Sequence, residues 1–269
     1  MRNSQQQRTS RDWRAGAFSG LRWEADPARA TNPGGAGGFF VYSEPGGHFG
    51  YLKPTAVWPD THPCAANEKI VADLGHEAGL RIPPVQLYTR DPCPAGQESR
   101  TCVSLVMYDE VHEWSAMMNL QGPVGAVVRA SMARDCGIIA LDTLIGNTDR
   151  NNGRNALFGV DAAAPAEGAF VFLDSANSLN MGNRWDNGNW KTVDVPPMPD
   201  LLRNSVDVAI LSDAIDQISA VTDAVIEEIV NRIPDAYMVP DHKRVVVAGL
   251  KGRRTLVRPK LKEAFPGLA

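Results

Sequence analysis

The sequence changes character near residue 110, and this change restricts the possible fold more than any other feature. Before it, short runs rich in Val, Tyr and Phe alternate with turns that contain Gly and Pro, as in a small antiparallel sheet. After it, apolar residues recur mainly at helical spacing, which predicts a buried helix of about twenty residues that is broken or kinked near Gly137. Further helices are predicted over 206–219 and 222–232. Strands in one half and helices in the other indicate an α+β protein with two lobes. We expect a flexible leader over residues 1–34, a strand-rich N-lobe over 35–110 and a helical C-lobe over 111–269.

The composition is that of an ordinary globular protein, and it argues against several other classes. The 269 residues are 43% hydrophobic and 22% charged, which allows one large domain or two lobes. A net charge of −4 argues against direct nucleic-acid binding. No apolar run approaches the ~18 residues that span a bilayer, and the polar N-terminus has no hydrophobic signal core. We expect a cytoplasmic protein that does not insert into membranes.

The four cysteines form no Cys-x-x-Cys motif. Cys93 and Cys102 flank a loop rich in Pro and Gly and could bridge in an oxidising compartment, whereas in a cytosolic chain free thiols are expected. His62 and Cys64 are one pair of zinc-ligand types, but nothing at normal spacing completes a tetrahedral set. We therefore expect no structural zinc site.

A polar loop in the C-lobe joins a buried helix to a strand. The loop spans residues 147–155 and contains Asp149, Asn155 and further asparagines. The strand over 156–160 follows, and a second strand delivers Asp174 at its end. These groups suit phosphoryl transfer from a metal-bound nucleotide, because one Asp can orient the attacking hydroxyl while an Asn and the other Asp hold Mg²⁺. An ordinary turn rich in Asn, Asp and Gly is the alternative interpretation.

The N-lobe begins with a glycine-rich loop that runs into a strand over 39–42. Its glycines are Gly34, Gly35, Gly37 and Gly38. Glycines before a strand let backbone amides approach an anion closely, although a flexible linker would have the same composition. A hairpin turn then returns the chain through a strand over 48–53 that ends at Lys53. Its ammonium could reach nucleotide phosphates, and an exposed strand-end lysine is the alternative.

A helix is predicted over 65–78, because apolar residues recur there at core spacing, and Gly79 is its expected end. Glu68 lies in the first turn, where a carboxylate favours the helix dipole. The functional alternative is an ion pair between Glu68 and Lys53 that aims the lysine at the nucleotide.

Two further strands are predicted over 82–88 and 101–106. The second leads into an extended segment over 107–111, which would form the hinge between the lobes and could hydrogen-bond an adenine edge. Leu105 and Met107 are candidates for the apolar walls of that adenine site, and both positions are equally compatible with a plain core role.

Taken together, these segments resemble the HipA-like branch of the fold that protein kinases share with phosphoinositide kinases. The resemblance runs from about residue 35 through most of the chain. It includes the segment Asp142-Thr-Leu-Ile-Gly-Asn-Thr-Asp-Arg150, whose specific part is Ile145-Gly-Asn-Thr-Asp-Arg150. It also includes the glycine loop and three further segments, namely Asn67-Glu68, Gly79-Leu-Arg-Ile-Pro83 and Phe172-Leu-Asp174. It implies a two-lobed protein-kinase-like fold that uses ATP and Mg²⁺.

The resemblance also implies a role for each matching residue. Asp149 matches the catalytic aspartate that positions the acceptor hydroxyl. Lys53 matches the lysine that contacts phosphate, and Glu68 matches the helix partner of that lysine. Asn155 and Asp174 match the metal ligands.

Two departures from the family pattern concern the polar loop. The family has His directly after the Asp-Arg pair, where this chain has Asn151. The metal-binding Asn usually follows the catalytic Asp with four residues in between. Here five residues separate Asn155 from Asp149, and Asn152 comes too early. The extra residue could bulge without effect or could displace a metal ligand.

The leading hypothesis is a kinase that phosphorylates a hydroxyl, with protein Ser/Thr expected ahead of a lipid or small molecule. Because HipA-like proteins include toxins, the resemblance also raises a toxin–antitoxin setting with an antitoxin or regulatory partner. A second hypothesis is a pseudokinase that binds a nucleotide or a partner without transferring phosphate. A third is an unrelated α+β binding protein.

Overall fold

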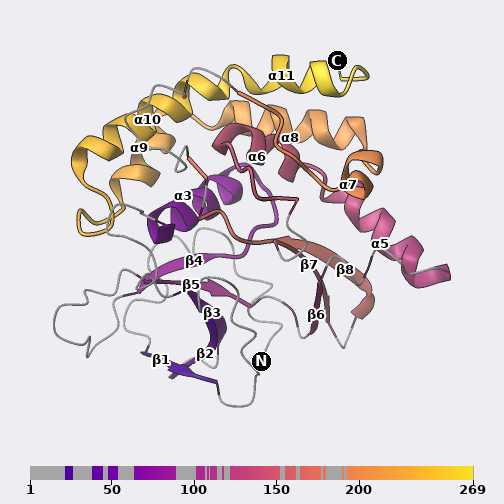
Figure 1. Cartoon of the computed structure of the whole chain (residues 1–269), viewed down its shortest axis with the longest axis horizontal. Helices are drawn as coiled ribbons and strands as arrows, with labels where there is room; N and C mark the ends of the chain where they lie inside the picture. Colours follow the sequence, from indigo (N-terminus) through magenta and orange to yellow (C-terminus); the bar gives the residue numbers. More distant parts are fainter. Residues whose placement is uncertain are drawn as a thin grey trace.

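The computed structural model of the chain shows two parts, with strands gathered at one end and helices at the other (Figure 1). This arrangement confirms the predicted α+β, two-lobed fold. The structure describes residues 22–26, 38–44, 48–53, 64–88, 101–106, 108, 110–113, 117, 122–151, 155–161, 164–176, 178–179, 190 and 193–268.

The N-terminal sheet has five antiparallel strands in the order β1-β2-β3-β5-β4. Their bounds are Arg22–Ala25 for β1, Phe39–Glu44 for β2, Phe49–Lys53 for β3, Val85–Tyr88 for β4 and Thr101–Leu105 for β5. Strands β2 to β5 confirm the predicted ones to within a few residues. Strand β1 lies in the predicted leader and was not foreseen; it pairs with β2, and its Trp23 packs into a small apolar cluster with Val41 and Leu52.

Helix α3, Cys64–Glu77, connects β3 to β4 and lies between the sheet and the helical part (Figure 1). It packs against β4 and β5 on one side and against α9, Asp223–Asn231, on the other. All its residues from Cys64 to Gly75 are buried. The predicted end is confirmed, because Gly79 takes the left-handed conformation (φ 66°) that stops a helix.

A second antiparallel sheet, in the order β6-β7-β8, lies beside the first (Figure 1). Its strands are Glu110–Glu113, Ala156–Asp161 and Ala164–Phe172. Strand β6 begins in the segment that the sequence assigned to the hinge. Strands β7 and β8 flank the candidate site, since β7 starts directly after Asn155 and β8 ends two residues before Asp174.

The remaining helices form the C-terminal part. They are α5 Gly122–Arg134, α6 Ile138–Ile145, α7 Asp200–Asn204, α8 Val208–Ala220, α9, α10 Pro240–Arg254 and α11 Val257–Ala264. The predicted break near Gly137 is confirmed and separates α5 from α6. A Cβ at Gly137 would lie 2.8 Å from the Cβ of Ala214, so the junction needs glycine to pack against α8.

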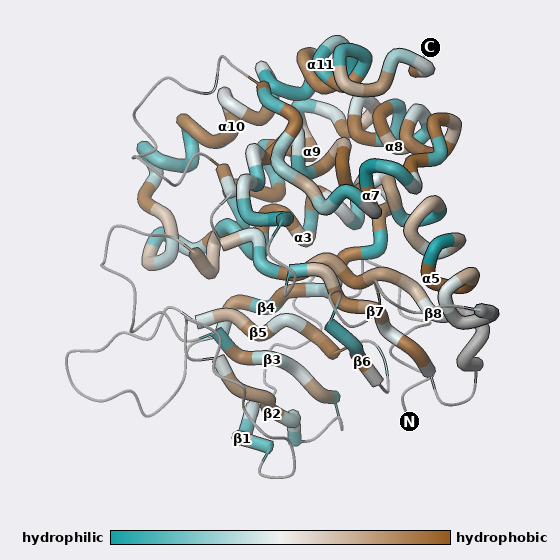
Figure 2. The backbone as a smooth tube through the Cα atoms, turned by 45° about the vertical axis from the view of Figure 1, so that its right-hand side comes forward, coloured by the Kyte–Doolittle hydropathy of each residue, from teal (hydrophilic) through white to brown (hydrophobic). Residues whose placement is uncertain are grey.

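The core and the surface follow this arrangement. Figure 2 shows hydrophobic residues concentrated along β4, β5 and β7, while hydrophilic residues are frequent along α10 and α11. One large apolar cluster joins α3, α6 and helices α8 to α11. Within the described ranges, no helix has the length and apolar character needed to cross a membrane.

Candidate active site

Lys53, Glu68 and Asp174 meet between the N-terminal sheet and the helical part. Lys53 ends β3 and forms an ion pair with Glu68 of α3. Its Nζ also lies 3.2 Å from the Oδ1 of Asp174. The predicted pairing of Lys53 with Glu68 is therefore present, and the alternative of an exposed strand-end lysine is wrong, because the Lys53 side chain is only 16% exposed.

Helix α3 also holds the segment that follows Asp174. The second carboxylate oxygen of Glu68 accepts a hydrogen bond from the backbone N–H of Ser175 at 3.1 Å. The Asn67 side chain donates to the carbonyls of Ala176 (3.0 Å) and Ser178 (2.8 Å). Asp174 itself has φ 58°, a left-handed conformation that non-glycine residues rarely adopt without support from their surroundings. Two adjacent residues of one helix supply part of that support.

The charges in this cluster stabilise one another. Burial lowers the pKa of the Lys53 ammonium, but the carboxylates of Glu68 and Asp174 outweigh this effect and raise the pKa above its usual value. Burial raises the pKa of the Asp174 carboxyl, whereas Lys53 lowers it, and the net pKa is below the usual value. Near neutral pH, Lys53 is therefore positive and Asp174 negative. The Asp174 side chain is 38% exposed, so a ligand could reach its carboxylate.

A buried ion pair supports the polar loop from behind. The guanidinium of Arg150 donates to both carboxylate oxygens of Asp142 at 2.7 and 3.0 Å, and each of the two side chains is 2% exposed. Arg150 also donates to the carbonyls of Asn155 and Leu173, and it lies 5.3 Å above the ring centroid of Phe172. One guanidinium thus joins α6, the start of β7 and the end of β8.

Sequence reasoning included Asp142 and Arg150 in the family motif but gave neither a role. The signal was available, because an Asp in the otherwise apolar α6 requires a buried partner, and an Arg follows it eight residues later.

Asp149 and Asn155 are in direct contact in spite of the longer spacing between them. The Nδ2 of Asn155 donates to the Asp149 carboxylate at 2.9 Å and to the Asp149 carbonyl at 3.0 Å. From the other side, Asn147 accepts from the Asp149 N–H at 3.0 Å and donates to Asp142 at 3.1 Å. Both ends of the loop therefore fix the Asp149 region. Asn151, which stands where the family has His, is exposed.

The oxygen atoms present fit a magnesium ion. Asn155 uses only its Nδ2 in the hydrogen bonds above, and within the described ranges its Oδ1 accepts none. The ionised Asp174 offers a second hard oxygen ligand. In the described part of the chain, no three His, Cys, Asp or Glu residues are grouped to form a metal cage. This agrees with the usual magnesium site, where one or two protein oxygens act together with substrate phosphates and water.

The other predicted binding residues are less informative. Gly34, Gly35, Gly37 and Met107 lie outside the described residues. Packing alone explains the glycine at position 38, since a Cβ there would lie 2.5 Å from the ring of Tyr51. Leu105 is buried in the same apolar cluster as Trp23, and its contact with a nucleotide stays a prediction. Cys64, Cys102 and Cys136 are free and buried, whereas Cys93 lies outside the described residues.

Comparison with known proteins supports the fold. No protein-family model matches the chain, and no curated protein matches its sequence. Among solved structures, the Helicobacter pylori proinflammatory kinase CtkA is similar over 92% of this chain and 98% of its own, with a TM-score of 0.63 and 15% identity. WaaP in complex with acyl carrier protein matches over 93% of this chain and 91% of its own, with 14% identity, but its TM-score of 0.37 is too low to support an argument. The chain therefore has a kinase-like fold over nearly its full length, and the HipA-like branch stays a prediction.

Proposed function

We propose that this protein is a kinase that transfers phosphate from ATP to a hydroxyl group with the help of Mg²⁺. One observation carries the proposal: Lys53 is held between Glu68 and Asp174, in a kinase-like fold whose polar loop holds Asp149 against Asn155. Phosphoryl transfer depends mainly on positioning and on charge stabilisation, and these residues supply both.

Each residue then has a definite task. The Lys53 ammonium binds the phosphates, and Glu68 keeps it in position. The Asp149 carboxylate orients the acceptor hydroxyl, and the Asn155 amide fixes that carboxylate. Asp174 and the Oδ1 of Asn155 would hold magnesium, which when bound neutralises negative charge on the phosphates. The glycine loop would cover the nucleotide, with Leu105 and Met107 beside the adenine.

The acceptor is proposed to be Ser or Thr of a protein. This part of the proposal rests on the resemblance of Ile145-Gly-Asn-Thr-Asp-Arg150 to the HipA-like branch. The same resemblance supports a toxin–antitoxin setting, in which an antitoxin or another regulatory partner restrains the activity. The boundary between the lobes at residues 110 and 111 belongs to this proposal as well, with β1 counted in the N-lobe because it pairs with β2.

The test is incubation of the purified protein with γ-labelled ATP and Mg²⁺. Three acceptor pools are offered separately: the protein itself with a bacterial lysate, lipid vesicles, and small-molecule alcohols. The variants Asp149→Asn and Asp174→Asn are compared with the control Asp241→Asn, which removes an equivalent charge from an exposed position on α10. Thermal melting with and without Mg-ATP is recorded for every sample.

Label transfer to protein by the wild type and the control, reduced by ~10²–10⁴-fold in Asp149→Asn, would support the proposal. Transfer to lipid or alcohol only would support the kinase activity and contradict the proposed protein acceptor. A melting shift without transfer to any pool would favour the pseudokinase. The absence of both would refute nucleotide chemistry at this site.

A further inference from the structure

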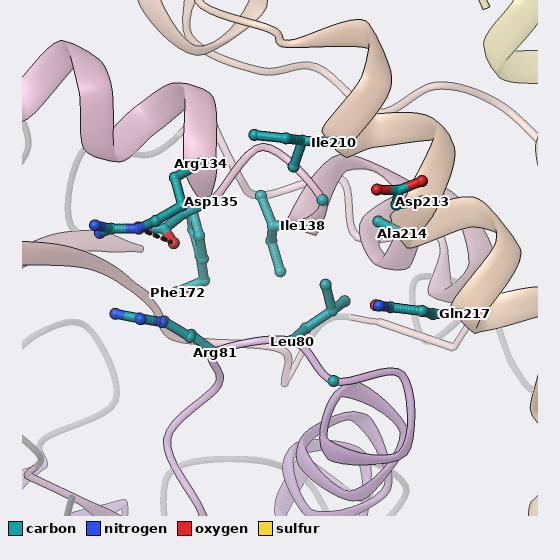
Figure 3. Close-up of a pocket in the computed structure, with 12 residues that line it drawn as sticks. Leu80, Arg81, Arg134, Asp135, Ile138, Phe172, Ile210, Asp213, Ala214 and Gln217 are labelled. Carbon is teal, nitrogen blue, oxygen red and sulfur yellow. Dashed lines mark hydrogen bonds and ion pairs between the residues drawn. The ribbon is translucent and has the colours of Figure 1, made fainter.

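An open pocket of about 270 Å³ lies apart from the Lys53 site and is lined by four elements. The turn after α3, the α5–α6 junction, the end of β8 and the helix α8 each supply part of its wall (Figure 3). It contains none of the residues that the proposed phosphate transfer uses. Its volume is just below the ~300–1,000 Å³ typical of pockets for drug-sized ligands, so its occupant is smaller than a drug.

The middle of the pocket is apolar. Leu80 and Ile138 stand at the centre of the view in Figure 3, and Phe172 lines the pocket to their left, next to Asp135. Ala214 of α8 completes this surface. Such a surface favours methylene or other apolar groups, because they leave water without needing hydrogen-bond partners.

The two ends of the pocket carry opposite charges. At one end Arg81 lies beside Arg134 and Asp135, and at the other end α8 contributes Asp213 and Gln217 (Figure 3). The Arg134 guanidinium is already used, since it donates to the Asp135 carboxylate at 3.2 Å and to the Gly168 carbonyl at 2.9 Å.

The other charged and polar groups at the ends are available. Across the described part of the chain, the side chains of Arg81, Asp213 and Gln217 make no hydrogen bond or ion pair. The Arg134–Asp135 pair is neutral overall, so Arg81 sets a positive charge at one end. Asp213 sets a negative charge at the other.

We propose that this pocket binds a small linear zwitterion. A carboxylate of the ligand pairs with Arg81, an ammonium pairs with Asp213 and donates to Gln217, and an apolar middle lies over Leu80, Ile138 and Phe172. A simple anion would leave Asp213 unpaired, and a simple cation would leave Arg81 unpaired. The zwitterion satisfies both ends and covers the apolar middle.

The probe for this proposal is 6-aminohexanoate, which has the two charges at the ends of a methylene chain. Hexanoate keeps only the carboxylate, and hexylamine keeps only the ammonium. Binding is followed by NMR on protein with ¹³C-labelled Leu and Ile methyl groups. We expect millimolar affinity, as befits a ligand with few atoms. The methyl signals of Leu80, Ile138 and Ile210 should shift, and that of Leu52 in the N-terminal sheet should not.

The charge at each end predicts a separate result. 6-Aminohexanoate should bind at least ~3-fold more tightly than hexanoate or hexylamine, because each exposed ion pair adds a modest amount of binding free energy. Arg81→Ala should lower the affinity for 6-aminohexanoate to that of hexylamine and leave hexylamine binding unchanged. Asp213→Asn should lower it to that of hexanoate. Arg129→Ala and Asp241→Asn change exposed residues elsewhere and should have no effect.

Three results would overturn the proposal. One is failure of 6-aminohexanoate to shift the pocket methyl signals at concentrations well above the millimolar range. Another is binding of hexanoate or hexylamine as tightly as the zwitterion. The third is equal binding by the wild type, Arg81→Ala and Asp213→Asn. Because Arg81 and Asp213 are exposed, their variants should melt like the wild type, and no measurement requires ATP or phosphate transfer.

Discussion

Replacing Arg150 with Met tests whether the buried ion pair supports the polar loop. The substitution leaves the Asp142 carboxylate at 2% exposure with its bidentate partner removed, and it leaves the carbonyls of Asn155 and Leu173 without their guanidinium donor. Removing one member of a buried pair costs ~3–5 kcal/mol, and the loss of a hydrogen bond to a buried carbonyl adds ~1 kcal/mol or more. We therefore expect the free energy of unfolding to fall by ~4–6 kcal/mol.

A double-mutant cycle separates the pair from the other contacts of Arg150. The chain with both Asp142→Leu and Arg150→Met has no unpaired buried charge, so it should lose less stability than the two single variants added together, with an interaction of ~2–3 kcal/mol. Urea denaturation followed by circular dichroism gives each free energy, and an unchanged denaturant slope shows that compactness is retained.

The control for size and charge is Arg244→Met. Arg244 pairs with Asp241 on the surface of α10, where the two side chains are 73% and 79% exposed. That pair should contribute only ~0–1 kcal/mol. If Arg150→Met proves no more destabilising than Arg244→Met, the reasoning that places Arg150 at the centre of the loop is wrong.

Two further predictions concern Glu68 and Asn67, and a third concerns the buried thiols. Glu68→Gln keeps an acceptor for the Ser175 amide but loses the ion pair, so phosphate transfer should fall by ~10²-fold in the labelled-ATP assay. Because Lys53 keeps its pair with Asp174, the melting temperature without nucleotide should fall less than in Arg150→Met. Asn67→Ala removes two buried hydrogen bonds and should cost ~2 kcal/mol, with faster amide hydrogen exchange around residues 174–179; unchanged exchange would contradict this role.

Burial raises the pKa of the Cys64 and Cys136 thiols to about 11, so in a Cys93→Ser background a disulfide reagent at pH 8 should modify no thiol until urea is added. The stability that these neutral thiols contribute is present below pH ~8.5 and is lost as the pH rises through about 11.

The sequence predicted the parts of the fold that have strong local signals. The helices α3, α8 and α9 bury repeating apolar positions, and the glycines at 79 and 137 end or break helices because a side chain there would be strained or would collide. Strand β1 was missed because it buries only Trp23. Strand β6 was missed because two of its four residues, Val111 and Glu113, are exposed, so neither strand shows an apolar alternation.

The candidate site was predictable in its residues and less so in its connections. Spacing and family resemblance pointed to Lys53, Glu68, Asp149 and Asp174. They did not reveal that Asn67 holds two carbonyls more than a hundred residues away, or that Arg150 holds two backbone carbonyls. Backbone acceptors carry no residue identity, so a sequence pattern cannot single them out.

The position of α3 limits how the two lobes can move. Its contacts with β4 and β5 include apolar side chains, which can slide past one another. By contrast, two hydrogen bonds from Asn67 connect α3 to the segment after Asp174. Asp73 adds a link to Arg232 at 3.6 Å, just beyond α9. An opening motion should therefore carry α3 along with the helices and displace the sheet across it. Lys53 would then travel with the sheet and Glu68 with the helices, so the distance between these two side chains would measure how far the lobes have separated.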